Sequence, residues 1–178
     1  MQSSYSTVEL DYAAVLKSVC FSVNPLSIVE IGIGNGFSLD CFLDACPSEA
    51  VIKAYDIFDK FNGNHASFEK ISNKFPTISL AEGDFFNLHL SLPDNSVDLL
   101  HIDIANNGNV YEFAFDNYIG KLTPKGIMIL EGGSPERDGH DWMKRYEKPP
   151  INPLLKQNEN NFKILTFGTI PSITLIKR

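Results

Sequence analysis

The sequence predicts an α/β fold: a mostly parallel sheet that helices cover on both faces and that an antiparallel hairpin closes. Short apolar runs alternate with amphipathic stretches along most of the chain, and a glycine cluster directly follows the first run. Two β-type runs joined by a short connection end the chain. Strands that alternate with helices are typical of parallel sheets, and a short connection between the last two strands favours a hairpin at the sheet edge.

The apolar patterns also place the individual elements. Strands are expected at residues 27–31, 51–57, 77–81, 97–102 and 127–130, and the hairpin strands at 162–167 and 172–176. Helical spacing predicts helices at 8–19, 38–45, 66–74 and 110–122, with a further short helix at 141–146.

Length and charge limit the possible functions. The 178 residues fit one domain, 1–178, with a helical segment at 1–26 and a polar, proline-interrupted segment at 132–160 that is placed to cover a substrate. The net charge is −7 and the basic residues are scattered, which argues against a surface that binds polyanions. We therefore expect a small-molecule partner and no nucleic acid.

The chain carries no signal for a membrane or for export. Its apolar runs are too short to cross a bilayer, and its first residues lack the basic start and apolar stretch of a secretory signal. The three cysteines have no metal-ligand spacing. These features predict a cytoplasmic protein without a membrane partner.

Three glycines in five residues, Gly32, Gly34 and Gly36, follow the first strand, and Glu30 stands just before them. Glycines at such a turn let backbone N–H groups approach a ligand closely. A dinucleotide-binding loop, G-x-G-x-x-G, would put the third glycine at position 37, whereas here it comes one residue earlier. We interpret the loop as a ligand-binding turn rather than an ordinary strand-to-helix connection.

Acidic residues stand at the ends of the second and third strands. A carboxylate at the tip of the second strand can accept hydrogen bonds from both ribose hydroxyls of a nucleoside over the loop, and Asp56 has that position. Asp84, after the third strand, can accept a hydrogen bond from an exocyclic amine, and Phe85 can line a ring face. Each residue also suits a turn or a helix cap.

With these residues in place, the chain resembles the class I S-adenosylmethionine-dependent methyltransferases. The E-x-G-x-G-x-G loop that begins at Glu30 resembles the first motif of that family, Asp56 its ribose-binding acid and Asp84 its adenine-contacting acid. The resemblance implies a Rossmann-like three-layer sandwich with a seven-stranded, mostly parallel sheet and an antiparallel C-terminal hairpin. It also implies an enzyme that uses S-adenosylmethionine as cofactor. Small members of the family often dimerise, so a homodimer is an implied partner.

A narrower resemblance lies at the end of the fourth strand. The His-Ile-Asp stretch at 101–103 resembles that of small-molecule O-methyltransferases, including some that act on sugars. The resemblance implies methyl transfer to an oxygen of a sugar or another hydroxyl compound. Several of those relatives bind a divalent metal through this aspartate and a later Asp-Asp or Asp-Asn pair. Here Glu-Gly-Gly at 131–133 replaces the pair, so only Asp103 and Glu131 remain as ligands and no metal is expected.

Candidates for the chemical step should lie at the carboxyl ends of strands four and five. The protein must orient the acceptor and remove the proton of a hydroxyl nucleophile. Asp103 is the first candidate, as general base or acceptor-binding group, and a helix-capping role is its alternative. Glu131 is the second, because the following glycines leave space for a ligand. His140, in a polar loop, is the third, whereas His101 should face the other way and suit the core.

Two residues near His140 have alternative interpretations. Trp142 can form a stacking wall for a substrate or lie buried beneath a helix N-terminus that Asp138 or Asp141 caps, and the second alternative is favoured. Arg137 can face an anionic substrate group.

Two other functions fit parts of the pattern. A nicotinamide-dependent oxidoreductase is disfavoured by the early third glycine, the terminal hairpin and the lack of a Tyr-x-x-x-Lys pair. A non-catalytic module that binds S-adenosylmethionine fits the altered residues around Asn106 and Gly132.

Overall fold

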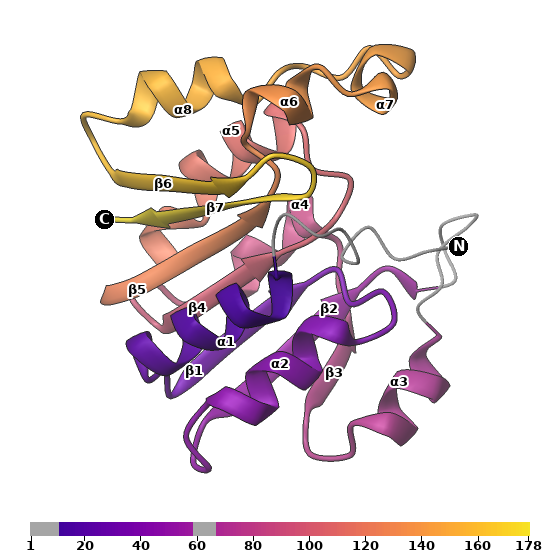
Figure 1. The fold of residues 1–178 in the computed structure, drawn as a ribbon. Coiled ribbons are helices and arrows are strands. Elements are labelled where there is room, and N and C mark those ends of the chain that lie inside the picture. Colours follow the sequence, from indigo (N-terminus) through magenta and orange to yellow (C-terminus); the bar gives the residue numbers. More distant parts are fainter. Residues whose placement is uncertain (1–10, 59–66) are drawn as a thin grey trace.

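The computed structural model describes residues 11–58 and 67–178. The described residues form a seven-stranded sheet in the order β3-β2-β1-β4-β5-β7-β6. The strands are β1 (Ser27–Ile31), β2 (Val51–Asp56), β3 (Ser79–Glu82), β4 (Val97–Ile102), β5 (Leu122–Glu131), β6 (Lys163–Gly168) and β7 (Ser172–Lys177). The first five strands pair in parallel, and β7 is antiparallel to both of its neighbours. This arrangement confirms the predicted α/β fold and its closing hairpin (Figure 1).

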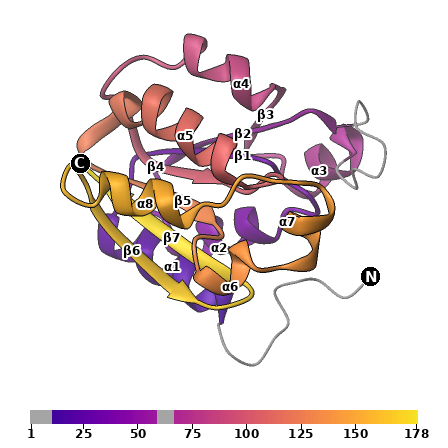
Figure 2. The same cartoon turned by 90° about the horizontal axis from the view of Figure 1, so that it is seen from above.

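Helices cover both faces of the sheet (Figure 2). They are α1 (Tyr12–Val23), α2 (Phe37–Ala45), α3 (Phe68–Lys74), α4 (Phe85–Leu88), α5 (Gly108–Asn117), α6 (Pro135–Asp138), α7 (Asp141–Arg145) and α8 (Asn152–Asn158), with 3-10 turns η2 (His89–Ser91) and η3 (Ile119–Lys121). One apolar core joins α1, α2 and α3 to one face, and a second joins α4, α5 and α8 to the other. The chain is therefore a three-layer sandwich.

Alternate residues of each strand enter different cores. Ile28 and Leu99 pack with α1 and α2, whereas Val29 and Leu100 pack with α5. This follows from the two-residue period of a strand. Because both faces are covered, the central strands are mostly apolar, with Glu30 and His101 as buried polar exceptions, and they form nearly continuous apolar runs in the sequence.

The opening helix runs further than its prediction. Asp11 is the N-cap of α1, where its side chain accepts the N–H of Ala14, and Asn24 ends the helix in a left-handed conformation with φ 50°. The start of the predicted helix at 8–19 lies outside the described residues, and so do residues 1–10 of the predicted 1–26 region. The predicted stop before Pro25 is confirmed.

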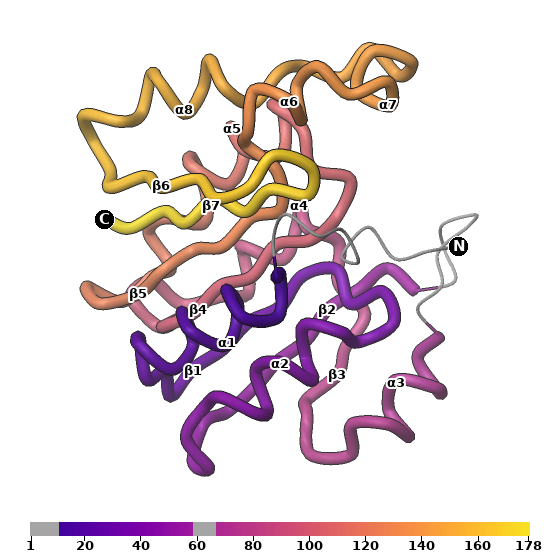
Figure 3. The backbone as a smooth tube through the Cα atoms, viewed as in Figure 1, coloured from indigo at the N-terminus to yellow at the C-terminus, as the bar shows by residue number. Residues whose placement is uncertain are grey.

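The segment 132–160 contains more helix than predicted. Three short helices, α6, α7 and α8, replace the single helix expected at 141–146. The prolines of this segment suggest irregular chain, but Pro135 and Pro153 both lie in the first turn of a helix, where a missing N–H costs nothing. The end of β5, α6 and α7 follow one another along one edge of the sheet (Figure 3).

Within residues 11–58 and 67–178, no helix combines the length and the apolar character that crossing a bilayer requires.

Candidate functional site

A pocket opens where the glycine loop leaves β1. Its lining includes Tyr12, Gly32, Gly34, Ser38 and Asp103. Parallel strands end at the same edge of a sheet, so the β1 and β4 ends meet here: the Asp103 N–H donates to the Ile31 carbonyl at 3.0 Å. The pocket thus lies at the carboxyl edge of the sheet, where ligands bind in open α/β folds.

The three glycines of the loop serve different purposes. All have positive φ, at 90° for Gly32, 55° for Gly34 and 80° for Gly36. A Cβ on Gly32 would collide with the Asp103 carbonyl, and one on Gly36 would collide with the Phe75 ring. Only a Cβ on Gly34 would meet open space. Gly34 is therefore the point of the loop where a ligand can approach the backbone.

Asp56 joins the glycine loop to the end of β2. One carboxylate oxygen accepts the N–H of Ile33 at 2.8 Å, and the other accepts the N–H of Phe58 at 2.9 Å. The residue is buried. The structure places Asp56 beside the loop, as the sequence predicts, and its contact with ribose stays a prediction.

Glu30 lies beneath the loop, away from the pocket lining. It is completely buried, and its carboxylate accepts a hydrogen bond from the hydroxyl of Ser38 and pairs with His101 Nδ1 at 3.0 Å. Burial raises the pKa of Glu30, while the bonds from His101 and Ser38 oppose this rise. Glu30 therefore links β1, β4 and α2, and a direct contact with a cofactor stays a prediction. His101 is a core residue, as expected.

Asp84 and Phe85 follow β3, but their side chains diverge. Asp84 is the exposed N-cap of α4 and accepts the N–H of Phe86 at 3.0 Å. Phe85 is only 3% exposed and stacks on Tyr118 with ring centroids 5.1 Å apart. The expectation that Phe85 lines a ligand surface is corrected by this core position, because its face is covered by another aromatic ring.

The two candidate carboxylates, Asp103 and Glu131, follow β4 and end β5, which are neighbouring strands. The side chain of Glu131 is 16% exposed, and its Oε2 forms an ion pair with Arg137 Nη2 at 3.2 Å. Burial raises the pKa of Glu131 to about 7; Asp103 raises it further and Arg137 lowers it. A carboxyl group with a pKa near neutrality can both accept and return a proton.

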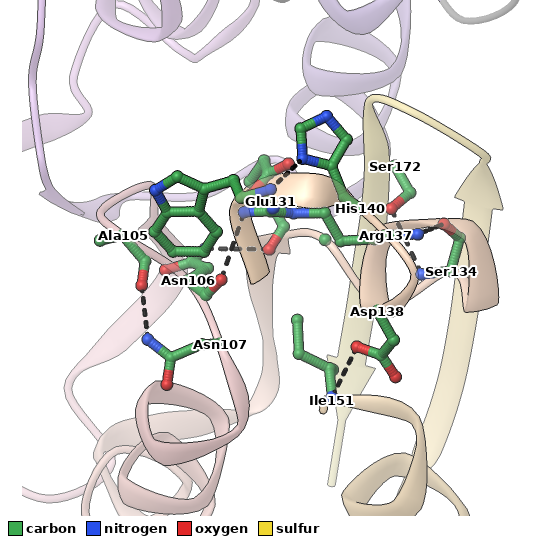
Figure 4. A network of polar contacts seen from close by, with 12 residues as sticks. Ala105, Asn106, Asn107, Glu131, Ser134, Arg137, Asp138, His140, Ile151 and Ser172 are labelled. Atoms are coloured by element: carbon green, nitrogen blue, oxygen red, sulfur yellow. Dashed lines mark hydrogen bonds and ion pairs between the residues drawn. The ribbon is translucent and has the colours of Figure 1, made fainter. Parts of the chain in front are cut away.

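Arg137 bridges the ends of these two strands. Its Nη2 also donates to the Asn106 carbonyl at 3.3 Å, and its guanidinium carbon lies 4.9 Å from the centre of the Trp142 ring. Figure 4 shows Asn106, Glu131 and Arg137 converging on one point. Trp142 is therefore half-buried against a cation and not beneath a helix cap, which corrects the favoured interpretation.

Buried amide and phenol groups fix the end of β5. Asn106 Nδ2 donates to the carbonyls of Ile102 and Glu131, each at 2.9 Å, and the Tyr111 hydroxyl donates to the Glu131 carbonyl at 3.2 Å. Asn106 is completely buried. These bonds hold the backbone of Glu131 at a fixed distance from β4.

His140 lies outside this group of residues. It is exposed, and its Nδ1 accepts the N–H of Trp142 at 3.1 Å, which makes it the N-cap of α7. The cap of this helix is therefore neither Asp138 nor Asp141, the two alternatives, and Asp138 instead accepts the N–H groups of Ile151 and Asn152. The structure gives His140 a capping role, and a role as a base stays a prediction.

Sequence reasoning missed one residue of the site and underused another. Tyr12 lines the pocket because α1 packs across the sheet, and a single Tyr in an opening helix carries no local signal for this. Arg137 was assigned to a substrate anion, whereas its partner is Glu131. Within the described residues, no cluster of three or more His, Cys, Asp or Glu side chains could hold a metal ion.

Comparison with known proteins agrees with the resemblance to methyltransferases. A family model described as a methyltransferase domain matches residues 29–131. A curated relative, the uncharacterized protein y4gI of Sinorhizobium fredii (strain NBRC 101917 / NGR234), is 27% identical over 146 residues. The match covers 75% of this chain and 16% of that protein, so the chain spans less than a fifth of its relative.

Solved structures share the fold at low identity. A methyltransferase from Geobacter sulfurreducens has a TM-score of 0.64 and 19% identity, with 96% of this chain and 79% of that chain covered. The O-methyltransferase TomG from Streptomyces achromogenes, in complex with SAM, has a TM-score of 0.68 and 14% identity, covering 96% and 81%. A SAH-bound methyltransferase from Podospora anserina has a TM-score of 0.63 and 17% identity, covering 93% and 76%.

Proposed function

We propose, from the premise that this chain belongs to the methyltransferase-domain family, that it transfers a methyl group to an oxygen of a small-molecule acceptor such as a sugar or another hydroxyl compound. The cofactor is S-adenosylmethionine, as in the solved relatives that carry it or its product. The observation that carries the proposal is the pocket at the glycine loop, which has Asp103 in its wall and Glu131 at the end of the adjoining strand.

The residues around the loop fit this cofactor. Gly34 leaves its backbone open to a ligand, and Asp56 stands at the end of the neighbouring strand with both oxygens on backbone N–H groups. Carboxylate oxygens have further lone pairs that can accept ribose hydroxyls. Gly32, Gly34, Asp56 and Asp84 are the residues that would hold it. When bound, the cofactor supplies an electrophilic methyl group on its sulfonium.

The residues at the ends of β4 and β5 act on the acceptor. Asp103, in the pocket wall, accepts a hydrogen bond from a second hydroxyl of the acceptor and so orients the reacting one. Glu131 takes the hydroxyl proton, because its pKa of about 7 allows it to be unprotonated before the reaction and basic enough to gain the proton. The half-buried position of Glu131 keeps bulk water from competing with the acceptor.

The remaining parts of the proposal concern partners and location. The net charge of −7 favours a small molecule over nucleic acid as the substrate. A cytoplasmic location and a homodimer complete the proposal.

Calorimetric titration with S-adenosylhomocysteine and with NAD⁺ tests the cofactor assignment. We expect binding of S-adenosylhomocysteine only, and in Asp56→Asn a loss of about 1–3 kcal/mol through weaker pairing of the ribose hydroxyls. Asp44→Asn is the control, because Asp44 is an exposed aspartate that forms an ion pair with Lys17 at the surface. Binding of NAD⁺ in place of S-adenosylhomocysteine, or equal affinity in Asp56→Asn and the wild type, would contradict the proposal.

A further inference from the structure

The Arg137 side chain lies directly over the end of β5. The nearest atoms to a Cβ built on Gly132 include Arg137 Cγ at 3.6 Å and Arg137 Nε at 3.7 Å. The side chain therefore fills the space above Gly132 and brings its guanidinium to Glu131, the preceding residue.

A side chain at either of the two positions after Glu131 would be strained. Gly132 and Gly133 have φ of 100° and 104°, which side chains of L-amino acids rarely adopt. A Cβ on Gly133 would also collide with the Thr174 hydroxyl. The backbone after β5 thus leaves room for the arginine and disfavours a pair of carboxylates at these positions.

The segment that carries Arg137 is fixed on both sides. The Arg137 N–H donates to Ser134 Oγ at 3.0 Å, and the Ser134 hydroxyl donates to the Thr169 carbonyl of the hairpin connection. On the other side, Asp138 accepts the N–H of Ile151 at 2.7 Å (Figure 4). Arg137 is therefore held in place before any ligand arrives, which reduces the ordering cost of binding.

The guanidinium keeps unused hydrogen-bonding capacity. Arg137 Nε and Asn106 Oδ1 are buried and have no hydrogen-bond partner within the part of the chain that the structure describes. Their residues are joined by the bond from Arg137 Nη2 to the Asn106 carbonyl. Buried polar atoms are paired in most folded proteins, so a donor and an acceptor left unpaired on contacting residues point to a ligand.

We propose that the Arg137 guanidinium is the resident cation of the crevice between the ends of β4 and β5, where it contacts Glu131 and Trp142. It stands in place of a divalent metal, so that the reaction needs no metal. The role of this cation in methyl transfer rests on the proposed function, whereas its presence in the crevice does not. Arg137 acts as a positioning residue through Glu131.

The charges of the crevice support this assignment. Mg²⁺ takes six oxygen ligands, of which one or two are usually carboxylates and several are waters, so what excludes it here is whether the carboxylates already have a cation. Here Asp103 and Glu131 are the two carboxylates, and Glu131 already bears an ion pair. Arginine stays charged at all physiological pH values, so a metal would have to displace a permanent cation from its carboxylate and from the face of Trp142.

Mn²⁺ tests the cation site without an acceptor. The electron paramagnetic resonance signal of free Mn²⁺ is measured as protein is added, with and without S-adenosylhomocysteine, for the wild type and Glu131→Gln. We expect the two proteins to remove the same amount of Mn²⁺ from solution, because the crevice takes none. Mn²⁺ binding in the wild type that Glu131→Gln abolishes would overturn the proposal.

A carbon-13 NMR titration of Glu131 tests the positioning role. We expect Arg137→Gln to raise the pKa of Glu131 above its wild-type value of about 7, and Arg137→Lys to restore part of the difference. Arg145→Gln is the matched control, since Arg145 is exposed on α7. An unchanged Glu131 titration in Arg137→Gln would also overturn the proposal.

The two proposals fail separately. A wild-type protein that does not bind S-adenosylhomocysteine contradicts the proposed function, while the Mn²⁺ and NMR measurements on the free protein still decide whether Arg137 is the resident cation.

Discussion

His101 Nδ1 lies 3.0 Å from Glu30 Oε1, and both side chains are completely buried. The pair joins neighbouring strands β1 and β4 directly beneath the glycine loop. Because Ser38 at the start of α2 donates to the same carboxylate, the strand before the loop and the helix after it share one buried acceptor. The loop geometry therefore depends on a polar group that a ligand need not touch.

We expect His101→Ala to destabilise the protein by about 2–5 kcal/mol, because it opens a cavity against Phe42 and leaves the Glu30 carboxylate with one partner fewer. Urea denaturation measures this change in the free energy of unfolding. His140→Ala makes the same substitution at an exposed cap and should cost at most about 1 kcal/mol. Equal losses of unfolding free energy in the two variants would show that the buried pair stabilises the protein no more than an exposed helix cap does.

Glu131 should make stability depend on pH. Its pKa is about 7 in the folded protein, against about 4.3 in an unfolded chain. Between these two pH values the folded state therefore binds more protons than the unfolded chain. The stabilisation that Glu131 contributes is fully present below about pH 4.3 and is lost as the pH rises through about 7. Relative to Glu131→Gln, we expect the wild type to lose about 1–3 kcal/mol over this range.

Urea denaturation of both proteins across the range measures this difference. Glu136→Gln, an exposed change on the same segment, is the control. A difference between the wild type and Glu131→Gln that stays constant with pH would contradict the raised pKa.

The order of strands was predictable because each is a short apolar run with its own boundary signal. Asn24-Pro25 and the glycine loop delimit β1, and residues 168–171 set the terminal hairpin apart. The β5 strand starts earlier than predicted, at Leu122, because Thr123 and Gly126 belong to an irregular pairing with β4 that the turn-like sequence does not reveal. Local residue preferences carry the type of an element better than its ends.

The sequence predicted a residue of the candidate site only where that residue stands directly at the end of a predicted strand. Asp56, Asp103 and Glu131 were found from the rule that parallel strands end at one edge. The pairing of Arg137 with Glu131 depends on the left-handed turn at Gly132 and on how α6 is anchored to distant parts of the chain. Such tertiary contacts leave no periodic signal in the sequence.

The glycine loop allows a paired test of fold and ligand binding. Gly32→Ala should destabilise the protein by about 2 kcal/mol or more, because the new methyl group meets the Asp103 backbone and φ is 90°. Gly34→Ala should cost only about 1–2 kcal/mol of backbone strain, because its Cβ meets nothing.

The affinity for S-adenosylhomocysteine, measured by calorimetry, tests the ligand contact. We expect Gly34→Ala to remain folded but to lose affinity, since the methyl group occupies the approach to the loop. Full affinity in a folded Gly34→Ala protein would place the ligand elsewhere.

Trp142 is the single tryptophan of the chain, so its fluorescence reports on the crevice alone. The Arg137 guanidinium carbon lies 4.9 Å from its ring centre, and a cation held against an indole covers one face of the ring. Replacing Arg137 by Ala should expose that face to water and shift the emission to longer wavelength. Arg145→Ala removes an exposed arginine from the same helix as Trp142 and should leave the emission unchanged. Identical spectra for Arg137→Ala and the wild type would mean that the two side chains do not stack in solution, and Arg137 would then lack one of the contacts that hold it over the end of β5.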